Sequence, residues 1–525
     1  MELYQAGADF FDRQLKQKQS ARRVSQLDLL IRGGSVIDGS GGAPRKADVG
    51  IANDRIVFVG DAAQENLQAA RTIDAAGLIV APGFIDPHTH AGEDLTNPKK
   101  KSNQNYLFQG VTTVLTGNDG SAPFPPGETL AHWDRQGIGT NAALFVGHGT
   151  VRQRVMGMSD SAPSPEQLEK MKELVRQAMD EGALGMSTGL YYAPGSYAKT
   201  EEVIELARVV AERGGIYDTH MRDESSYNIG LLGSINETIR IGREARIPVH
   251  ISHIKALGTD VWGQSAQAIE IINRARSEGV DVTANQYPYT ASGTSLTAAL
   301  VPRWAEAGGA AELRKRIADQ SLRPRLIAEM EANLKRRGGP ESLLITSAAD
   351  KQFVGKRLNE IAREMNQPPV EAALSLIGNS GHFSVASFNM NEKDIENFMR
   401  QPWVMTGSDG STGHPRKYGN YPRKIREYVI NRQVISLPRM IEASSSQVAR
   451  TFKLRDRGQL SEGYYADVIV FDEKTIADRA TYEQPEQLAS GMRYVIVNGK
   501  LAIDEGKYTG ALAGRALRGI GSREF

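Results

Sequence analysis

The chain has 525 residues, a formal net charge of +1, 40% hydrophobic residues and 24% charged residues. This length predicts two or more domains, and the balanced charge argues against a nucleic-acid or membrane-surface partner. The sequence has no cysteine and no apolar run near the roughly 20 residues of a membrane span. Disulfides, thiolate metal ligands and a membrane-spanning helix are therefore excluded.

Residues 1–26 form a polar N-terminal extension that lacks the apolar core of a signal peptide. We expect a surface helix or arm there and a cytoplasmic protein, with the periplasm as the alternative if a signal peptide is removed before Met1. Residues 27–80 and 455–525 both contain short strand-like runs separated by glycine turns. Two β-rich ends around a different middle predict one composite β-sandwich domain built from both termini.

Residues 81–454 alternate between strand-like and helix-like patterns. Ser164-Pro165-Glu166-Gln167 is a capping box that begins one amphipathic helix, and Thr200 begins another. Eight strand candidates lie at 78–85, 112–116, 142–146, 183–187, 216–220, 249–253, 282–285 and 403–406. Repeated strand–helix units predict the α/β class and a (β/α)8 TIM barrel. The eighth strand comes too late for one helical crossover, which predicts a small insertion over the barrel mouth at about 286–339.

Residues with metal-ligand chemistry recur where the predicted barrel strands end. They are His88 and His90 after the first strand, Asp119 after the second, His220 at the fifth, His253 at the sixth and Asp409 after the eighth. Barrel enzymes carry their chemistry at this rim, and imidazole and carboxylate bind zinc and similar ions. The sequence therefore predicts a metal site there. His250 points to the other strand face, His132 and His148 are predicted to be structural, and His382 is unassigned.

The run Pro82-Gly83-Phe84-Ile85-Asp86-x-His88-x-His90, with His220, His253 and Asp409, resembles the amidohydrolase superfamily. The runs 182–190, 285–289 and 407–410, and then His414-Pro415-Arg416, resemble the D-aminoacylases, which are N-acyl-D-amino-acid deacylases. The resemblance covers residues 27 to about 518. It implies a metal-dependent hydrolase in which His220 and His253 hold the tighter ion, and His88, His90 and Asp409 hold or approach a weaker one. One or two divalent ions are expected, zinc first, with manganese or cobalt as alternatives.

Asp119 is where this chain departs from the family it resembles. The family bridges its two metals with a cysteine in a Gly-Asn-Cys-Gly context, and this chain reads Gly117-Asn118-Asp119-Gly120. The fourth strand supplies neither a lysine nor a glutamate, so Asp119 is the evident bridge. A carboxylate is a harder ligand than a thiolate and favours harder ions. The alternative is that Asp119 only shapes the turn.

The resemblance also assigns roles around the substrate. Asp409 takes a proton from the attacking water and passes it to the leaving amine, while Lys255, Tyr287 and Arg416 hold the α-carboxylate. We further expect Ser187, Tyr191 and Tyr192 to shape the pocket, and the insertion, with Arg303 and Trp304, to form a lid. The substrate is then a small N-acyl-D-amino acid, and the products are a carboxylate and a free D-amino acid. A homo-oligomer is left open.

Two other functions fit the same residues. A cyclic-amide or dipeptide hydrolase of the same superfamily would use the same metal ligands. A catalytically silent scaffold is the alternative of another class, because the bridging cysteine is absent.

Overall fold

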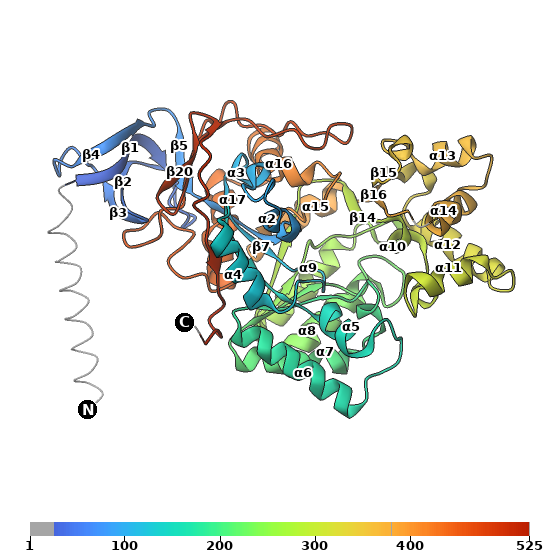
Figure 1. The fold of residues 1–525 in the computed structure, drawn as a ribbon. Helices are drawn as coiled ribbons and strands as arrows, with labels where there is room; N and C mark the ends of the chain where they lie inside the picture. The colour runs from blue at the N-terminus through green and yellow to red at the C-terminus, as the bar shows by residue number, and fades with distance from the viewer. Residues whose placement is uncertain (1–25, 380, 524–525) are drawn as a thin grey trace, which may run out of the picture.

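The computed structural model describes residues 26–379 and 381–523. The extension predicted for residues 1–26 lies, except for Gln26, outside the described residues. A barrel occupies the middle of the molecule, with a mixed β-sheet domain on one side and a helix-rich insertion on the other (Figure 1).

One nine-stranded sheet combines the two ends of the chain. Its strand order is β21-β20-β19-β18-β5-β1-β2-β3, with β4 paired to β1. The strands are β1 (Gln26–Val36), β2 (Arg45–Ala52), β3 (Arg55–Gly60), β4 (Gln68–Asp74), β5 (Ile79–Pro82), β18 (Val468–Phe471), β19 (Met492–Val497), β20 (Lys500–Asp504) and β21 (Lys507–Tyr508). The antiparallel pair of β5 and β18 joins the N-terminal strands to the C-terminal ones. The predicted composite β-sandwich is confirmed.

The (β/α)8 barrel is also confirmed. Its strands are β6 (Phe84–Thr89), β7 (Val111–Thr116), β8 (Asn141–Leu144) continued by β9 (Val146–Gly147), β10 (Gly185–Gly189), β11 (Ile216–His220), β12 (Val249–Ile251), β13 (Val282–Gln286) and β17 (Val404–Thr406). All neighbouring pairs are parallel, so their carboxyl ends share one rim. The backbone N–H of Asp409 donates to the carbonyl of His88 at 2.9 Å and closes the ring between the last strand and the first.

The first predicted strand, 78–85, was wrong as a single element. Residues 79–82 form β5 in the nine-stranded sheet, and β6 begins the barrel at Phe84. The chain passes between the two domains at Gly83, where an added Cβ would lie 2.2 Å from the hydroxyl oxygen of Thr112. Only glycine allows this approach, and an apolar run does not reveal where a strand changes sheets.

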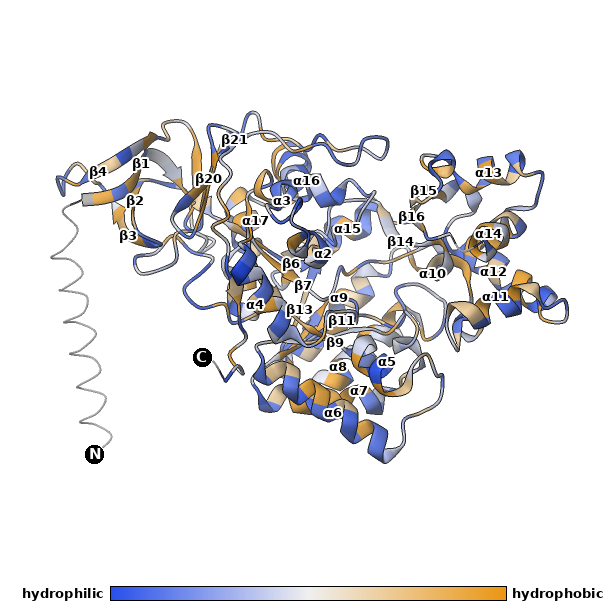
Figure 2. Cartoon of the chain, in the orientation of Figure 1, coloured by the Kyte–Doolittle hydropathy of each residue, from blue (hydrophilic) through white to orange (hydrophobic). Residues whose placement is uncertain are grey.

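The helices around the barrel present an apolar stripe inward. The predicted capping box is formed, because Ser164 Oγ accepts the Gln167 N–H at 3.2 Å and Gln167 Oε1 accepts the Ser164 N–H at 2.8 Å. Hydrophobic and hydrophilic stripes run along α6 and α7 (Figure 2). The helices outside the insertion are α2 (Gly92–Thr96), α3 (Gln104–Leu107), α4 (Pro126–Gln136), α5 (His148–Met156), α6 (Pro165–Asp180), α7 (Thr200–Glu212), α8 (Gly230–Ala245), α9 (Ser265–Ser277), α15 (Glu392–Met399), α16 (Arg416–Arg423), α17 (Leu437–Ala443) and α18 (Ser446–Thr451). Among the described residues, no helix has both the length and the hydrophobicity needed to cross a membrane.

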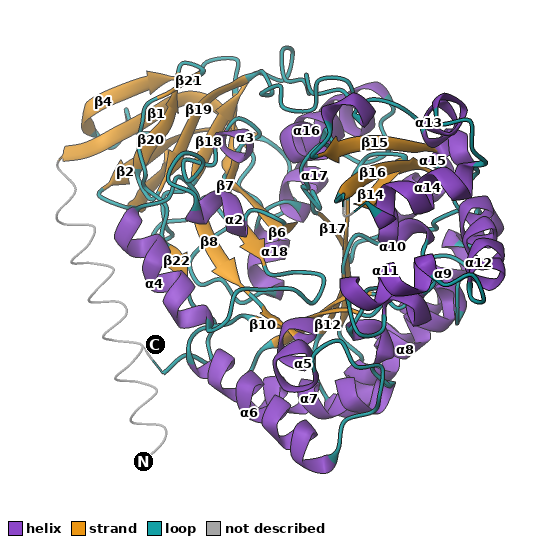
Figure 3. Cartoon of the chain, turned by 45° about the vertical axis from the view of Figure 1, so that its right-hand side comes forward, coloured by secondary structure: helices purple, strands orange, loops and turns teal. Residues whose placement is uncertain are grey.

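The insertion is larger than the predicted span of about 286–339. It comprises β14 (Ala291–Ser295), α10 (Leu296–Leu300), α11 (Ala310–Ala318), α12 (Arg323–Arg336), β15 (Leu343–Ala348), α13 (Leu358–Glu364), α14 (Pro369–Gly378) and β16 (Phe383–Phe388). β16 lies between β14 and β15 in a three-stranded sheet beside these helices (Figure 3), so the sheet is complete only at Phe388. The insertion has an apolar core of its own, which makes it a separate packing unit.

Candidate functional site

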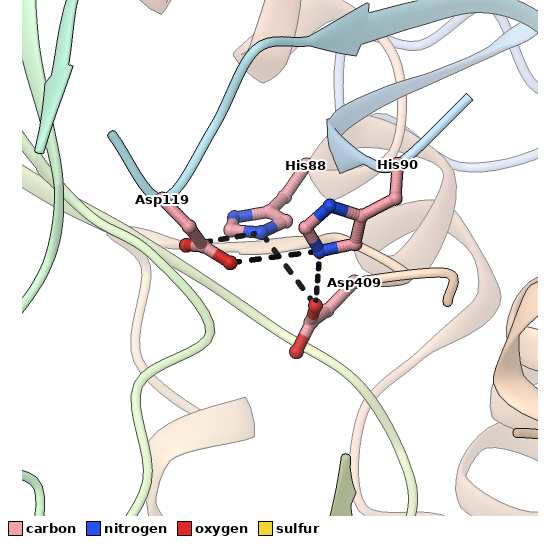
Figure 4. Close-up of side chains that lie close together, drawn as sticks. All are labelled: His88, His90, Asp119 and Asp409. Carbon is pink, nitrogen blue, oxygen red and sulfur yellow. Dashed lines mark hydrogen bonds and ion pairs between the residues drawn. The ribbon is translucent and has the colours of Figure 1, made fainter. Parts of the chain in front are cut away.

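Four of the predicted ligands surround one point at the barrel rim. His88 lies on β6 and His90 directly follows it, while Asp119 and Asp409 follow β7 and β17. Figure 4 shows both imidazoles facing the two carboxylates. His88 Nε2 lies 3.5 Å from Asp119 Oδ1 and 3.6 Å from Asp409 Oδ1. His90 Nε2 lies 3.5 Å from Asp119 Oδ2 and 3.1 Å from Asp409 Oδ1.

Asp119 also belongs to a second group, with His220 and His253. Its Oδ1 lies 3.6 Å from His220 Nδ1 and 3.4 Å from His253 Nε2. In each group the candidate donor atoms lie within 4.8 Å of one another. The structure thus brings together all six predicted ligands and places Asp119 between the two groups.

The spacing and the unmet bonding capacity of these atoms fit divalent metal ions. Two ligands of one tetrahedral zinc ion lie roughly 3.4 Å apart when each bond is about 2.1 Å long. Most of the contacts above are close to that value and too long for hydrogen bonds. Among the described residues, Asp119 Oδ1, His88 Nε2 and His220 Nδ1 are buried and lack hydrogen-bond partners. Buried polar atoms are rarely left unsatisfied, so a cation is the partner that this donor set lacks.

Asp119 forms a turn with its backbone and faces the histidines with its side chain. Its φ of 59° lies in the left-handed region, which aspartate and asparagine tolerate better than most residues. Within the described residues, its carboxylate accepts no backbone N–H. Burial would raise the pKa of this carboxyl, but His88, His220 and His253 outweigh it and hold the pKa well below its ordinary value. The turn sequence and the carboxylate therefore serve different purposes.

Asp409 is held by Arg416. Arg416 Nη2 lies 2.9 Å from Asp409 Oδ2 and donates to Ser411 Oγ at 3.2 Å. Burial would raise the pKa of the Asp409 carboxyl, but Arg416 and His253 hold it below its ordinary value, so the carboxylate is ionised. The other oxygen, Oδ1, is the one that faces His90.

The three predicted carboxylate-binding residues lie beside one another. The ring centre of Tyr287 is 4.5 Å from Arg416 Cζ and 5.7 Å from Lys255 Nζ. The Tyr287 hydroxyl lies 3.9 Å from the Met390 sulfur, so its ring rather than its hydroxyl meets the two cations. Within the described residues, Arg416 Nε and Nη1 are buried and without hydrogen-bond partners. They are donors available to a ligand.

Glu224 is a site residue that the sequence reasoning missed. Its Oε1 lies 2.6 Å from Lys255 Nζ and 3.0 Å from His253 Nδ1, and its Oε2 lies 3.7 Å from His220 Nε2. The Glu224 carboxylate thus contacts, on each of these two histidines, the ring nitrogen that does not face Asp119. Burial would raise the Glu224 pKa, but Lys255 and His220 lower it below its ordinary value. Its position four residues after His220 was the only signal in the sequence.

Of the residues predicted to shape the pocket, the two tyrosines line the cavity and the serine does not. Tyr191 and Tyr192 line the cavity, with ring centres 5.8 and 4.7 Å from that of His220. Ser187 instead donates to Asp218 Oδ2 inside the barrel. Arg303 stacks on Tyr191 at 4.5 Å, and Trp304 packs against the core of the insertion.

The histidines that were not predicted as metal ligands lie in different places. His250 is buried on β12, with its ring nitrogens bonded to Thr283 and Asn285. His148 pairs with Glu202 at 2.9 Å. His382, which had no assigned role, lines the cavity from the insertion.

The metal-ligand groups open into a cavity of about 540 Å³ between the barrel and the insertion. The barrel contributes the ligands and the loops after β10 and β11, and the insertion contributes residues of β14, β15 and β16, including Thr294, Thr346 and Ser384. This volume suits a small molecule with several polar groups.

Comparison with known proteins points to one family. Residues 71–503 match the model of the Amidohydrolase family. D-aminoacylase of Alcaligenes xylosoxydans xylosoxydans is 34% identical over 94% of this chain and 97% of its own length. A solved structure of D-aminoacylase described as having a binuclear metal center covers 94% of this chain and 100% of its own, with 33% identity and a TM-score of 0.80. N-acyl-D-glutamate deacylase from Bordetella bronchiseptica, solved with zinc and a phosphonate inhibitor, gives 30% identity and a TM-score of 0.80 over the same shares.

Proposed function

The chain belongs to the amidohydrolase family, and we propose that it hydrolyses the amide bond of N-acyl-D-amino acids, giving a carboxylate and a free D-amino acid. One observation carries this proposal. Two groups of metal-ligand atoms share Asp119 at the floor of a cavity that also presents the free donors of Arg416. An amide at the metals with a carboxylate at Arg416 is the arrangement of an N-acyl amino acid.

We assign the metal ligands from the two groups of donor atoms. His220, His253 and Asp119 would hold one divalent ion, zinc first. His88, His90, Asp119 and Asp409 would hold or approach a second. A divalent ion bound there supplies Lewis-acid activation of the amide carbonyl and of the attacking water.

Asp409 moves the proton. Arg416 fixes Oδ2, while Oδ1 faces the rim, 3.1 Å from His90 Nε2. The ionised carboxylate takes the proton of the attacking water and then gives it to the departing amine. The lowered pKa of Asp409 keeps it in the basic form before the reaction begins.

Arg416, Lys255 and Tyr287 orient the substrate. Arg416 Nε and Nη1 are free to bind the α-carboxylate, and Lys255 adds a second positive charge beside the Tyr287 ring. This contact sets which face of the α-carbon meets the metals, and so sets the stereochemical preference.

Glu224 positions three of these groups. It accepts a hydrogen bond from Lys255 and stands behind the rings of His253 and His220. A carboxylate behind a metal-binding imidazole fixes its tautomer and its orientation. Glu224 thereby links the metal site to the carboxylate site.

The predicted cytoplasmic location and a homo-oligomeric state stay predictions.

A chiral substrate panel tests the function. The purified protein, supplied with zinc, manganese or cobalt, is assayed against N-acetyl-D- and N-acetyl-L-amino acids, hydantoins and β-linked dipeptides. We expect the D-series to be hydrolysed fastest, and His253→Asn to abolish turnover and metal binding while His132→Asn on α4 does neither. Preferred hydrolysis of the cyclic amides or dipeptides would favour the other hydrolases. A protein that binds none of the metals and hydrolyses nothing would favour the silent scaffold.

A further inference from the structure

Arg337 is a buried cation of the catalytic cavity that has no carboxylate partner. It directly follows α12 in the insertion as the C-cap residue, lines the cavity and is only 2% exposed. Its Nε donates to the Ala299 carbonyl at 3.2 Å, Nη1 to Ser387 Oγ at 3.1 Å and Nη2 to the Tyr191 hydroxyl at 3.2 Å. None of the three acceptors is a carboxylate. Among the described residues, no carboxylate lies within 4.0 Å of its guanidinium.

The other two cations of the cavity differ in this respect. Lys255 is paired with Glu224 at 2.6 Å, and Arg416 is paired with Asp409 at 2.9 Å. Burying a charge without a counter-charge is costly, and buried charges in proteins are normally paired. The missing counter-charge of Arg337 therefore indicates a ligand.

The neighbours of Arg337 add further positive charge and a free donor. The Tyr191 hydroxyl accepts from Arg337 Nη2 and donates to the Ala298 carbonyl at 2.7 Å, and Arg303 Cζ lies 4.5 Å from the centre of the Tyr191 ring. Burial would raise the pKa of the Tyr191 phenol, but Arg337 and Arg303 together lower it below its ordinary value. The ring centre of Tyr227 lies 5.9 Å from Arg337 Cζ, and within the described residues its buried hydroxyl has no hydrogen-bond partner.

The guanidinium also has bonding capacity left. Arginine carries five N–H donors, and three of those of Arg337 are used, which leaves one on each terminal nitrogen. Two such donors match the two oxygens of a carboxylate. The Tyr227 hydroxyl can supply another hydrogen bond.

We propose that Arg337 and Tyr227 form a second anion subsite that binds a second carboxylate of the substrate, with Tyr191 holding the guanidinium in place. This subsite is distinct from the α-carboxylate contact, because the Arg337 guanidinium donates to Ala299, Ser387 and Tyr191, whereas Arg416 and Lys255 are paired with Asp409 and Glu224. The preferred substrates are then dianions. The second carboxylate belongs either to the amino-acid side chain or to a dicarboxylic acyl group. This inference rests on the proposed deacylase function.

Matched pairs of ligands that differ only in one charge test the subsite. N-acetyl-D-glutamate is compared with N-acetyl-D-glutamine for the side-chain arm, and N-succinyl-D-leucine with N-succinamoyl-D-leucine for the acyl arm. In one of the two pairs, kcat/KM of the wild type is expected to be higher for the charged substrate than for the neutral one. Arg337→Met should lower kcat/KM for that member by roughly ten- to a hundredfold and leave the neutral member within about threefold.

A binding measurement separates the subsite from turnover. Titration calorimetry with the free products D-glutamate and D-glutamine, and with any substrate that is not hydrolysed, should show the same dependence on Arg337. Charge-dependent binding without hydrolysis of any N-acyl-D-amino acid would refute the proposed function while the subsite stands.

Control variants address folding and general charge effects. Lys335→Met removes a positive charge from the exposed last turn of the same helix and should change neither member of a pair. Tyr227→Phe keeps the ring and should weaken only the charged member, even if Arg337→Met fails to fold. The proposal is overturned if wild type shows no preference for either charged member. It is also overturned if Arg337→Met lowers kcat/KM equally for the charged and the neutral substrate of a pair, as a purely structural role would. If Arg337→Met does not fold, the same outcome for Tyr227→Phe overturns it.

Discussion

Asp119→Asn separates the two roles of the residue between the metal-ligand groups. Asparagine keeps the shape of the side chain and tolerates the φ of 59°, so the turn is preserved and only the negative charge is lost. Alanine would add backbone strain and confuse the two effects. The carboxylate faces four imidazoles at 3.4–3.6 Å, so its charge serves both groups.

The expected loss is large. Removing one charged partner from a buried site costs about 3–5 kcal/mol, a factor of roughly a hundred to several thousand in metal affinity. Metal content after dialysis, measured by elemental analysis, and competition with a chromophoric chelator should show this loss. At limiting metal, kcat/KM should fall in parallel.

Two further variants complete the comparison. Asp61→Asn changes a turn aspartate in the β-sheet domain whose carboxylate accepts the Ala63 N–H at 3.0 Å, and it should leave metal content unchanged. Asp119→Cys restores the bridging residue of the resembled family and should recover zinc binding in preference to manganese. An Asp119→Asn protein with full metal content and full kcat/KM would refute the reasoning and reduce the residue to a turn former.

Three other predictions concern Glu224, Arg416 and Lys424. Glu224→Gln should weaken metal binding by about ten- to a hundredfold; chelator competition measures this, and unchanged affinity contradicts it. Arg416→Ala should lower kcat/KM for N-acyl-D-amino acids by roughly ten- to a hundredfold more than for the matching N-acyl amines. The amines should also lose activity, because Arg416 holds Asp409, and equal losses would exclude contact with the α-carboxylate. Burial lowers the pKa of Lys424, which donates to Thr406 Oγ1 at 2.9 Å, from 10.5 to about 7. Between pH 7 and about 10, the unfolded chain binds one more proton at this lysine than the folded chain does. The free energy of unfolding of wild type should therefore fall, relative to that of Lys424→Met, by about 1.4 kcal/mol for each pH unit from about 10 down to 7, and the difference should stay constant below 7. Urea unfolding across this range measures it, and a pH-independent difference contradicts it.

The sequence by itself determined the barrel and its composite β-sheet domain, and it singled out the six candidate metal ligands that the structure brings together. Strand and helix periodicities are local, so eight strand–helix units could be counted along the chain. Parallel strands end at one rim, so residues far apart in sequence, such as His90 and Asp409, could be placed together by topology alone. The carbonyl of His88 and the N–H of Asp409 do meet across the closing strands.

Only the tertiary structure decided the partners of the charged groups. Arg416 turned out to hold Asp409, and Glu224 to stand behind His220 and His253. The pattern of hydrophobic residues along the chain does not predict such pairs, because they form between the ends of different strands, helices and loops, whose relative positions depend on the packing of the whole fold. The division of the first predicted strand at Gly83 and the completion of the insertion by β16 are of the same kind.

Arg337 makes this difference plainest. In sequence it is one of several basic residues at the end of a surface-type helix. In the structure, the sheet of the insertion buries it against Tyr191, 146 residues away, and keeps every carboxylate of the described chain out of reach. The sequence gives the charge of a side chain. Whether that charge is paired depends on which groups the fold brings within a few ångströms of it, because the interaction depends on distance and burial and not on order along the chain.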